Sequence, residues 1–374
     1  MKKSKKFFAV FALVLSMSAF SAPIRHIIIF GDSLSDAGEN TPAEDVGNNF
    51  WAVAQGKTGA PIVNMDTRTQ THPLWVNWFS ELQHPRDTLH PWRLLNDKEL
   101  DPAVHSVNYA FASAETGDHW LNDISGEKYP PYVDAICHAP GKIGPKTACV
   151  PGVLKQVQLY LNAVHHPDPD TVFIVWAGGN DMLNNITKAF QLFSQQGIKD
   201  IAGKLLNQFE NLTAHTQKKN LSPAAPDFSD PLINLLAAKD RLIEAGVKPE
   251  QIYILNLPDL SKSPACILLS KGNPAILSAI HALSVAFNDG LSLTLSHNYF
   301  SDNNLPESNI LSVYDLLNEI IDNPEKYGMT HLSQNCVLDG QTPECKGYVF
   351  FNDKHPTAET GKIFARWAVE KIHP

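Results

Sequence analysis

The sequence predicts an α/β protein built on a parallel β-sheet. Short runs of β-branched and other apolar residues recur along the 374-residue chain, and helical patterns or long irregular stretches separate them. Most of these runs are almost continuously apolar, as expected of parallel strands that are covered on both faces. We therefore expect helices on the two sides of a five-stranded sheet.

Five apolar runs are the candidate strands. They are His26 to Phe30, Ser106 to Ala110, Thr171 to Trp176, Gln251 to Asn256 and Asn309 to Tyr314. Apolar residues at helical spacing predict helices that cover the sheet at 154–164, at 232–243 and, as a longer amphipathic segment, at 275–295. A last helix is expected to begin at Pro356-Thr357 and to continue through Val369.

The first 21 residues have the pattern of a secretory signal peptide. Lysines at positions 2, 3, 5 and 6 precede the apolar run Phe7 to Phe20, and Ala19-Phe20-Ser21 resembles a cleavage signal. An uncleaved membrane anchor is the alternative. We expect residues 22–374 to form a single exported domain, periplasmic or secreted, with insertions at about 40–105 and 118–150.

The charge balance argues against nucleic acid as a partner. The chain has 30 basic and 39 acidic residues, a net charge of −9, and removal of the four signal-peptide lysines gives −9 − 4 = −13. Binding to phosphate backbones calls for a basic stripe instead. The histidines show no HExxH spacing and the chain has no phosphate-binding glycine loop, so we predict neither a metal nor a cofactor.

Five cysteines suggest two local disulfides in an exported protein. Cys137 lies close to Cys149 and Cys336 lies close to Cys345, which leaves Cys266 over. Free buried thiols or a zinc site are the alternatives, but no CxxC spacing occurs.

Three polar residues follow predicted strands or begin the last helix, and together they suggest acyl-transfer chemistry. Ser33, in FGDSLSDAG, comes just after the first strand; Asn180, in WAGGND, follows the third; His355 lies in FFNDKHPT near the end. A serine hydroxyl becomes a useful nucleophile when an imidazole takes its proton, and an amide can stabilise the oxyanion. Helix capping is the alternative role for Ser33.

These stretches resemble the motifs of the GDSL, or SGNH, hydrolase family over nearly the whole mature chain. In family order they are Phe30 to Gly38, Asn108 to Ala114, Gly178 to Asp181, Asn256 to Leu260, and His355 to Thr357. The resemblance implies a flavodoxin-like, three-layer α/β/α fold and a serine hydrolase that needs no cofactor.

The resemblance also implies roles for individual residues. Ser33 would be the nucleophile and the donor of one backbone N–H to the oxyanion, and Asn180 would donate its side-chain amide. His355 would be the general base and then the general acid. Ser113 stands where the family usually has glycine, and its backbone N–H would face the oxyanion.

The orienting acid departs from the family pattern. The position three residues before His355 is occupied by Asn352, and Asp353 is its neighbour. Either the Asn352 side chain or a backbone carbonyl holds the imidazole, or Asp353 does. We favour Asp353 because of its charge.

Within the family the sequence is most similar to secreted phospholipases A, lysophospholipases and glycerophospholipid:cholesterol acyltransferases of Gram-negative bacteria, through Asp322 to Gly328 and the cysteine pair after it. This implies lysophospholipid or other lipid esters as substrates, peripheral contact with membrane lipid, and a sterol as an acyl acceptor. A carbohydrate acetyl-esterase is the alternative enzyme, and a non-catalytic surface-binding module is the alternative outside enzymes.

Both insertions are expected to leave the carboxyl edge of the sheet, where ligands bind in this architecture, although surface decoration is the alternative. In the first, an apolar helical face could wall an acyl channel or pack in the core; its residues are Leu74, Trp75, Trp78, Phe79 and Leu82. In the second, the loop from Cys137 to Cys149 is expected to be a lid that a protease cleaves at Lys142 or Lys146, which could activate the enzyme.

Overall fold

The structure is a computed structural model. It describes residues 24–36, 74–83, 88–91, 101–121, 128–129, 150–195, 200, 203–204, 230–298, 302–341 and 345–372. The expected signal peptide, most of both insertions and the Cys137–Cys149 pair lie outside the described residues.

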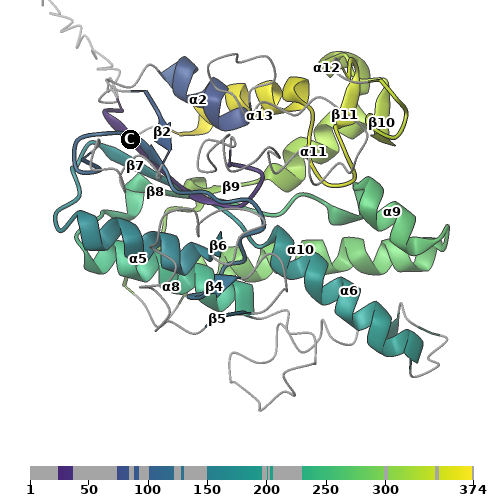
Figure 1. Ribbon diagram of the computed structural model, residues 1–374, viewed down its shortest axis with the longest axis horizontal. Helices are drawn as coiled ribbons and strands as arrows, with labels where there is room; N and C mark the ends of the chain where they lie inside the picture. The colour runs from purple at the N-terminus through teal and green to yellow at the C-terminus, as the bar shows by residue number, and fades with distance from the viewer. Residues whose placement is uncertain are drawn as a thin grey trace, which may run out of the picture.

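A parallel sheet forms the centre of the molecule (Figure 1). Its strands are β1 (His26–Gly31), β2 (His90–Pro91), β3 (Val107–Asn108), β7 (Thr171–Trp176), β8 (Ile252–Leu255) and β9 (Ile310–Leu311). They are arranged in the order β2-β3-β1-β7-β8-β9, and every neighbouring pair is parallel. The predicted α/β class is confirmed. The five expected strands are all present, in the flavodoxin-like order 2-1-3-4-5, and the two-residue β2 extends one edge.

Three strands are shorter than expected: β3 covers only 107–108 of the predicted 106–110, β8 covers 252–255 of 251–256, and the last strand is also short. We predicted a strand from Asn309 to Tyr314, but β9 ends at Leu311 because Ser312 begins a helix there. The Ser312 hydroxyl accepts the backbone N–H of Asp315 and caps α11 (Val313–Asp322).

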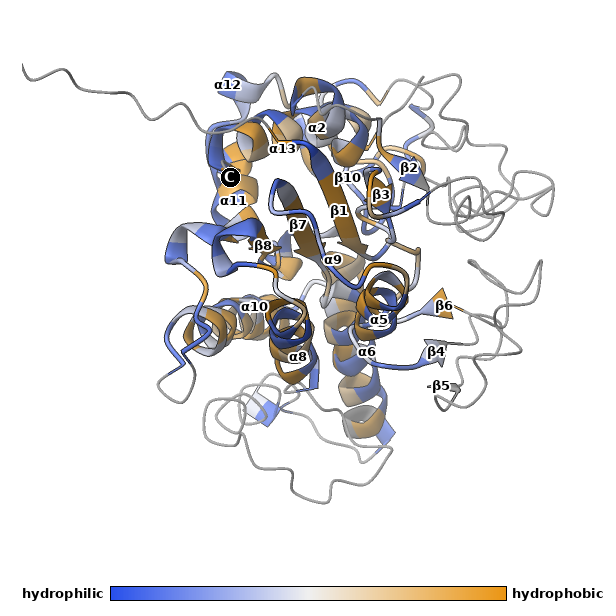
Figure 2. Cartoon of the chain, turned by 90° about the vertical axis from the view of Figure 1, so that its left-hand side faces the viewer, coloured by the Kyte–Doolittle hydropathy of each residue, from blue (hydrophilic) through white to orange (hydrophobic). Residues whose placement is uncertain are grey.

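Helices cover both faces of the sheet. One face packs against α2 (Trp75–Gln83), α11 and α13 (Ala358–Lys371); the other packs against α5 (Val153–Ala163), α8 (Asp230–Glu244) and α10 (Pro274–Ser296) (Figure 1). Each face of the sheet has its own hydrophobic core, and alternate residues of β1 pack in the two cores: Ile27 and Ile29 in one, Ile28 and Phe30 in the other. Figure 2 shows the hydrophobic strands β1, β7 and β8 between these helices. The arrangement is that of three α/β/α layers.

The ends of β1 and β7 are aligned at the carboxyl edge of the sheet. The two strands pair along their whole length, from His26 with Thr171 to Gly31 with Trp176. A Cβ at Gly31 would lie 2.6 Å from the Trp176 carbonyl oxygen, so this close approach requires glycine. The residues that follow the two strands therefore leave the sheet side by side, and α6 (Gly179–Gln195) begins there.

Smaller elements surround the sheet. Further helices are α9 (Pro264–Ser270) and α12 (Pro324–Tyr327), and η2 (Pro249–Gln251), η3 (Leu260–Lys262) and η4 (Glu307–Asn309) are 3-10 turns. Three antiparallel strands are β4 (Trp120–Leu121), β5 (Lys128–Tyr129) and β6 (Val150–Pro151), and a parallel pair consists of β10 (His331–Asn335) and β11 (Tyr348–Phe350).

The Cys336–Cys345 disulfide is confirmed, and it closes the loop between β10 and β11. Cys266 is a buried free thiol on α9, and burial raises its pKa.

The apolar face of α2 belongs to the core. Leu74, Trp75 and Phe79 are buried in the layer shared with α13, and the Lys362 ammonium lies 4.2 Å from the centroid of the Trp78 ring. Leu82 is exposed. These side chains do not line the pocket described below, so the structure favours the packing alternative over an acyl channel at α2.

Among the described residues, α10 alone is long and apolar enough to cross a membrane by length and composition. Its buried residues instead pack in the core against α8, η3 and α9, which is the usual reason for such a composition.

Removing the Cys336–Cys345 bond tests its contribution to stability. We expect the double variant Cys336→Ser/Cys345→Ser to lose about 2–3 kcal/mol of unfolding free energy, because the unfolded chain gains freedom in the opened loop. Urea unfolding followed by circular dichroism measures the change. If the midpoint and slope of the urea transition were the same in the wild type and the double variant, the disulfide would make no contribution to stability.

Candidate active site

Ser33 lies in a tight turn directly after β1. The Asp32 carbonyl accepts the N–H groups of Ser35 and Asp36 at 3.0 and 2.9 Å, and the Asp32 carboxylate accepts the N–H of Leu34 at 2.9 Å. This turn leaves the Ser33 side chain at the carboxyl edge of the sheet, as the sequence predicted for a residue just past the first strand.

A buried amide holds the end of β1. The Gln156 side chain, on α5, accepts the Gly31 N–H at 2.9 Å and donates to the Gly31 carbonyl at 2.9 Å. Gln156 is fully buried and also donates to the Pro151 carbonyl. It thus contacts both backbone groups of Gly31, the last residue of β1, whose carbonyl also accepts the Phe111 N–H at 3.2 Å.

His355 meets Ser33 across most of the chain. The Ser33 Oγ and His355 Nε2 atoms are 2.8 Å apart, although 322 positions separate the residues. His355 lies in a short loop after β11, closed by a hydrogen bond from the Phe351 N–H to the His355 carbonyl at 2.8 Å. The Thr357 hydroxyl then caps α13 by accepting the N–H of Thr360. The position of His355 is therefore fixed by β11 and its loop before it and by the capped start of α13 after it.

Asn352 orients the imidazole of His355. Its Oδ1 atom accepts the backbone N–H groups of Lys354 and His355, each at 2.9 Å, and lies 3.0 Å from His355 Nδ1. Two backbone donors require an acceptor, so the amide oxygen and not its nitrogen faces the ring. Nδ1 must then carry the proton, and Nε2 is left to accept the Ser33 hydroxyl proton.

Asp353 does not have the role that we favoured for it. Its side chain is exposed, and its backbone carbonyl accepts the N–H of Ala265 on α9 at 2.9 Å. The loop turns the neighbouring residue, Asn352, inward to His355. The contact with His355 Nδ1 is therefore made by the amide of Asn352, three positions before the histidine, and not by a carboxylate.

The environment keeps His355 neutral. Burial, and to a lesser degree the positive charge of Lys354, holds the pKa of His355 well below its ordinary value of 6.5. An imidazole in this state is a proton acceptor at neutral pH.

Asn180 lies in the same pocket as Ser33 and His355. It occupies the first turn of α6, and its Nδ2 donates to the Ala114 carbonyl at 2.9 Å. An amide nitrogen has two hydrogens, so one N–H remains for a ligand. The adjoining Asp181 carboxylate accepts the Thr116 hydroxyl at 2.8 Å and joins the same two segments.

Ser113 adopts the backbone conformation that glycine would favour. Its φ is 68°, in a turn closed by a hydrogen bond from the Ala114 N–H to the Phe111 carbonyl at 3.1 Å. The Asp36 carboxylate holds this turn by accepting the Ala112 N–H at 2.8 Å. Serine thus tolerates the left-handed region here, and the turn is tied to Asn180 through Ala114.

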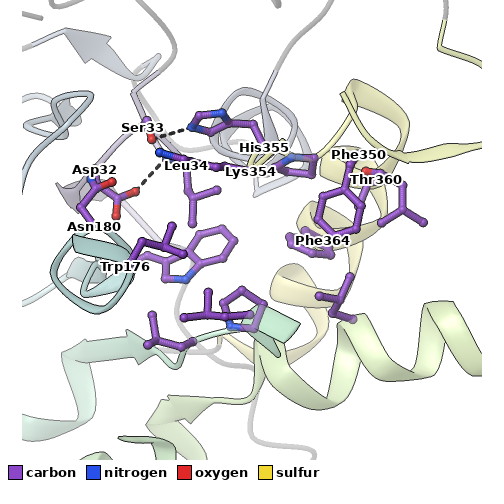
Figure 3. A pocket seen from close by; sticks show the side chains of 18 residues that line it. Asp32, Ser33, Leu34, Trp176, Asn180, Phe350, Lys354, His355, Thr360 and Phe364 are labelled. Carbon is purple, nitrogen blue, oxygen red and sulfur yellow. Dashed lines mark hydrogen bonds between the residues drawn. The ribbon is translucent and has the colours of Figure 1, made fainter. Parts of the chain in front are cut away.

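A largely apolar pocket opens beside Ser33 and His355 (Figure 3). Strand ends, the 257–260 segment, α11, β11 and α13 all contribute to its walls. The apolar residues are Leu34, Trp176, Leu183, Leu257, Pro258, Leu260, Leu317, Val349, Phe350, Pro356 and Phe364. Polar groups gather at one end, around Ser33, Asn180 and His355, and Lys354 lies there as well. Such a pocket suits a ligand with one polar group and an apolar chain.

The structure adds polar residues that the sequence analysis did not single out. Gln156 lies within the apolar stripe of a helix. Asp32, Asp36 and Asp181 lie in the motifs that contain Ser33 and Asn180, for which we predicted the functional roles. The signal that could have found them is a polar residue at an otherwise buried position, since such groups need partners.

Asp32 is a buried carboxyl group at the pocket. Burial, reinforced by the negative charge of Asp181, raises the pKa of Asp32 to about 7, while the hydrogen bond from Leu34 partly opposes the shift. The group therefore titrates close to neutral pH, directly beside Ser33.

Sequence comparisons found no matching family model and no matching curated protein. Within the described part of the chain, no group of three or more His, Cys, Asp or Glu side chains could hold a metal ion.

Asp32→Asn tests the buried carboxyl. The folded state keeps the Asp32 proton up to about pH 7, whereas the unfolded chain releases it near pH 4, so the wild type loses stability as pH rises between these values. The neutral amide has no such loss and can still accept the Leu34 N–H. At each pH we compare the unfolding free energy of the variant with that of the wild type. We expect this difference to be larger at pH 8 than at pH 4, in favour of the variant, by up to about 4 kcal/mol. Urea titrations at both values measure this difference, and equal differences would contradict the shift.

Proposed function

We propose that the protein is a serine esterase that hydrolyses acyl esters of lipids through an acyl-enzyme on Ser33. The observation that carries the proposal is the 2.8 Å contact between Ser33 Oγ and His355 Nε2 at the polar end of an apolar pocket. A nucleophile, a base and an amide donor meet there, as acyl transfer requires.

In the proposed first step, Ser33 Oγ attacks the ester carbonyl carbon while its proton passes to His355 Nε2. The carbonyl oxygen becomes an oxyanion, which the free N–H of Asn180 and the backbone N–H groups of Ser33 and Ser113 would stabilise. The oxyanion then collapses, the bond to the leaving alcohol breaks, and His355 Nε2 returns its proton to that alcohol. In the second step water attacks the acyl-enzyme by the same route, and the acid is released.

Asn352 supports this mechanism without carrying charge. Its oxygen keeps the proton on Nδ1, so Nε2 stays available as the base during each step. A neutral amide stabilises the transient imidazolium less than a carboxylate would, but the correct tautomer is kept.

The apolar walls of the pocket favour a substrate with a fatty acyl chain, such as a lysophospholipid. A chain of eight or more carbons would bury apolar surface against these walls, whereas an acetyl group would contact few of them. A sterol or another alcohol in place of water would make the protein an acyltransferase by the same chemistry.

Hydrolysis of lysophosphatidylcholine by the wild type and Ser33→Ala tests the proposal. Removal of the nucleophile should lower kcat at least about 10³-fold with little change in fold, because alanine cannot form the acyl-enzyme. Release of fatty acid measures the rate, and Ser333→Ala, at an exposed serine on β10, is the matched control. Equal rates for Ser33→Ala and the wild type would refute the proposal.

Asn352→Asp tests the orientation of the base. A carboxylate at Nδ1 stabilises the imidazolium, raises the pKa of His355, and should move the acid limb of the kcat/KM profile upward by about one to three pH units. Asp353→Asn, at the exposed neighbouring position, should leave this limb nearly unchanged. An acid limb that responds to Asp353→Asn and not to Asn352→Asp would reverse the assignment.

A further inference from the structure

We propose that a polar face of α10 determines the acyl-chain specificity of the pocket by clamping the segment Leu257–Leu260. The inference rests on the proposed esterase function and extends it from the reacting atoms to the wall that would meet the chain. His281, Ser284 and Asn288 form this face; they lie three and four residues apart and so share one side of the helix.

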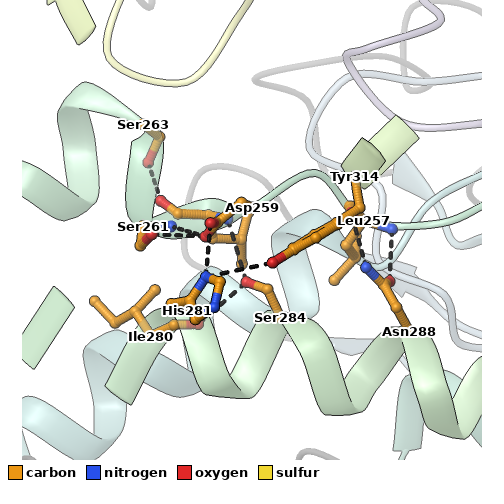
Figure 4. A network of polar contacts seen from close by, with 10 residues as sticks. Leu257, Asp259, Ser261, Ser263, Ile280, His281, Ser284, Asn288 and Tyr314 are labelled. Carbon is orange, nitrogen blue, oxygen red and sulfur yellow. Dashed lines mark hydrogen bonds and ion pairs between the residues drawn. The ribbon is translucent and has the colours of Figure 1, made fainter. Parts of the chain in front are cut away.

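Asn288 holds the first residue of the segment with two hydrogen bonds. Its Oδ1 accepts the Leu257 N–H at 2.9 Å, and its Nδ2 donates to the Leu257 carbonyl at 2.8 Å (Figure 4). The amide thereby takes the place of a strand neighbour just after β8 ends. The Leu257 backbone is satisfied at both groups and has little freedom to shift.

Ser284 and His281 hold the rest of the segment. Ser284 Oγ accepts the Leu260 N–H at 3.2 Å, and His281 Nδ1 lies 2.8 Å from the Asp259 carboxylate (Figure 4). The Asp259 side chain is fully buried, also accepts the Ser261 N–H and hydroxyl, and caps η3. Tyr314, on α11, places its hydroxyl 3.4 Å from the same imidazole nitrogen.

The clamped segment forms one wall of the pocket. Leu257, Pro258 and Leu260 line it, whereas the Asp259 side chain is held by His281 of α10. The helix also supports the turn before Asn180: Gly178 has a φ of 104°, and a Cβ there would lie 3.2 Å from Phe287 and 3.7 Å from Leu257. A change in the α10 contacts would therefore move the wall relative to the polar end of the pocket.

Polar contacts fix the position of the pocket wall, and so the space available to an acyl chain, more precisely than apolar packing alone. Hydrogen bonds are directional, so the segment has one position relative to Ser33. A short acyl group would be insensitive to the wall, whereas a long chain must pass along it. The clamp should thus affect the ratio of long-chain to short-chain turnover and leave the chemical step intact.

A chain-length series tests this with Asn288→Ala, Ser284→Ala and His281→Ala. The wild type and each variant are assayed with 4-nitrophenyl esters of increasing length, from acetyl to palmitoyl, and kcat and KM are determined separately. We expect Asn288→Ala to change the ratio of kcat/KM for dodecanoyl to butanoyl esters by about tenfold or more, mainly through KM, with the butanoyl kcat nearly unchanged. Asp289→Ala, at an exposed position on the same helix, is the control and should keep the wild-type ratio.

The outcomes separate the two proposals. A wild type that hydrolyses no ester of the series refutes the esterase proposal and the clamp with it. An active wild type, with the ratio unchanged in every folded variant, overturns the clamp alone. If Asn288→Ala does not fold, His281→Ala decides, because His281 is 48% exposed and its removal takes away the contact that holds the buried Asp259 carboxylate, in the middle of the segment, to α10.

Discussion

The hydrogen bond between Ser33 and His355 depends on which nitrogen of the imidazole carries the proton, and that is decided by one buried oxygen. Asn352 Oδ1 accepts two backbone N–H groups of its own loop, so the amide cannot rotate without leaving both unsatisfied. The third donor in reach is His355 Nδ1, and Nε2 is consequently the acceptor for Ser33. The backbone of the loop 351–355 thus fixes the tautomer of His355, which contacts Ser33 near the start of the chain.

Buried amides have a similar function at two strand ends. At the ends of β1 and β8, Gln156 and Asn288 each supply both a donor and an acceptor to one backbone residue, Gly31 and Leu257; the Gly31 carbonyl also accepts the Phe111 N–H at 3.2 Å. Each amide comes from a helix on the same face of the sheet. The core layer formed by α5, α8 and α10 therefore positions both the turn that holds Ser33 and a wall of the pocket, while the opposite layer carries His355 just before α13.

The strands, and the position of the proposed reacting residues at the carboxyl edge of the sheet, could be predicted because their signals are local. Continuous apolar runs marked β1 and β7 almost to the residue, and Ser33, Asn180 and His355 stand directly beside recognisable turns or caps. The partner of His355 could not be chosen this way: charge favoured Asp353, but the direction of each side chain depends on a loop closed by a backbone hydrogen bond. Gln156 and Asn288 were missed for a related reason: each is a polar residue on a largely apolar helix, and the sequence does not show which backbone groups lie opposite it.

The most direct test of the central claim is reaction with a fluorophosphonate, followed by peptide mass spectrometry. A serine whose proton is taken by His355 Nε2 should form a single phosphonyl adduct at Ser33, and folded His355→Ala protein should form it far more slowly. An adduct on another residue, or labelling of Ser33 at the same rate without the imidazole, would contradict the account.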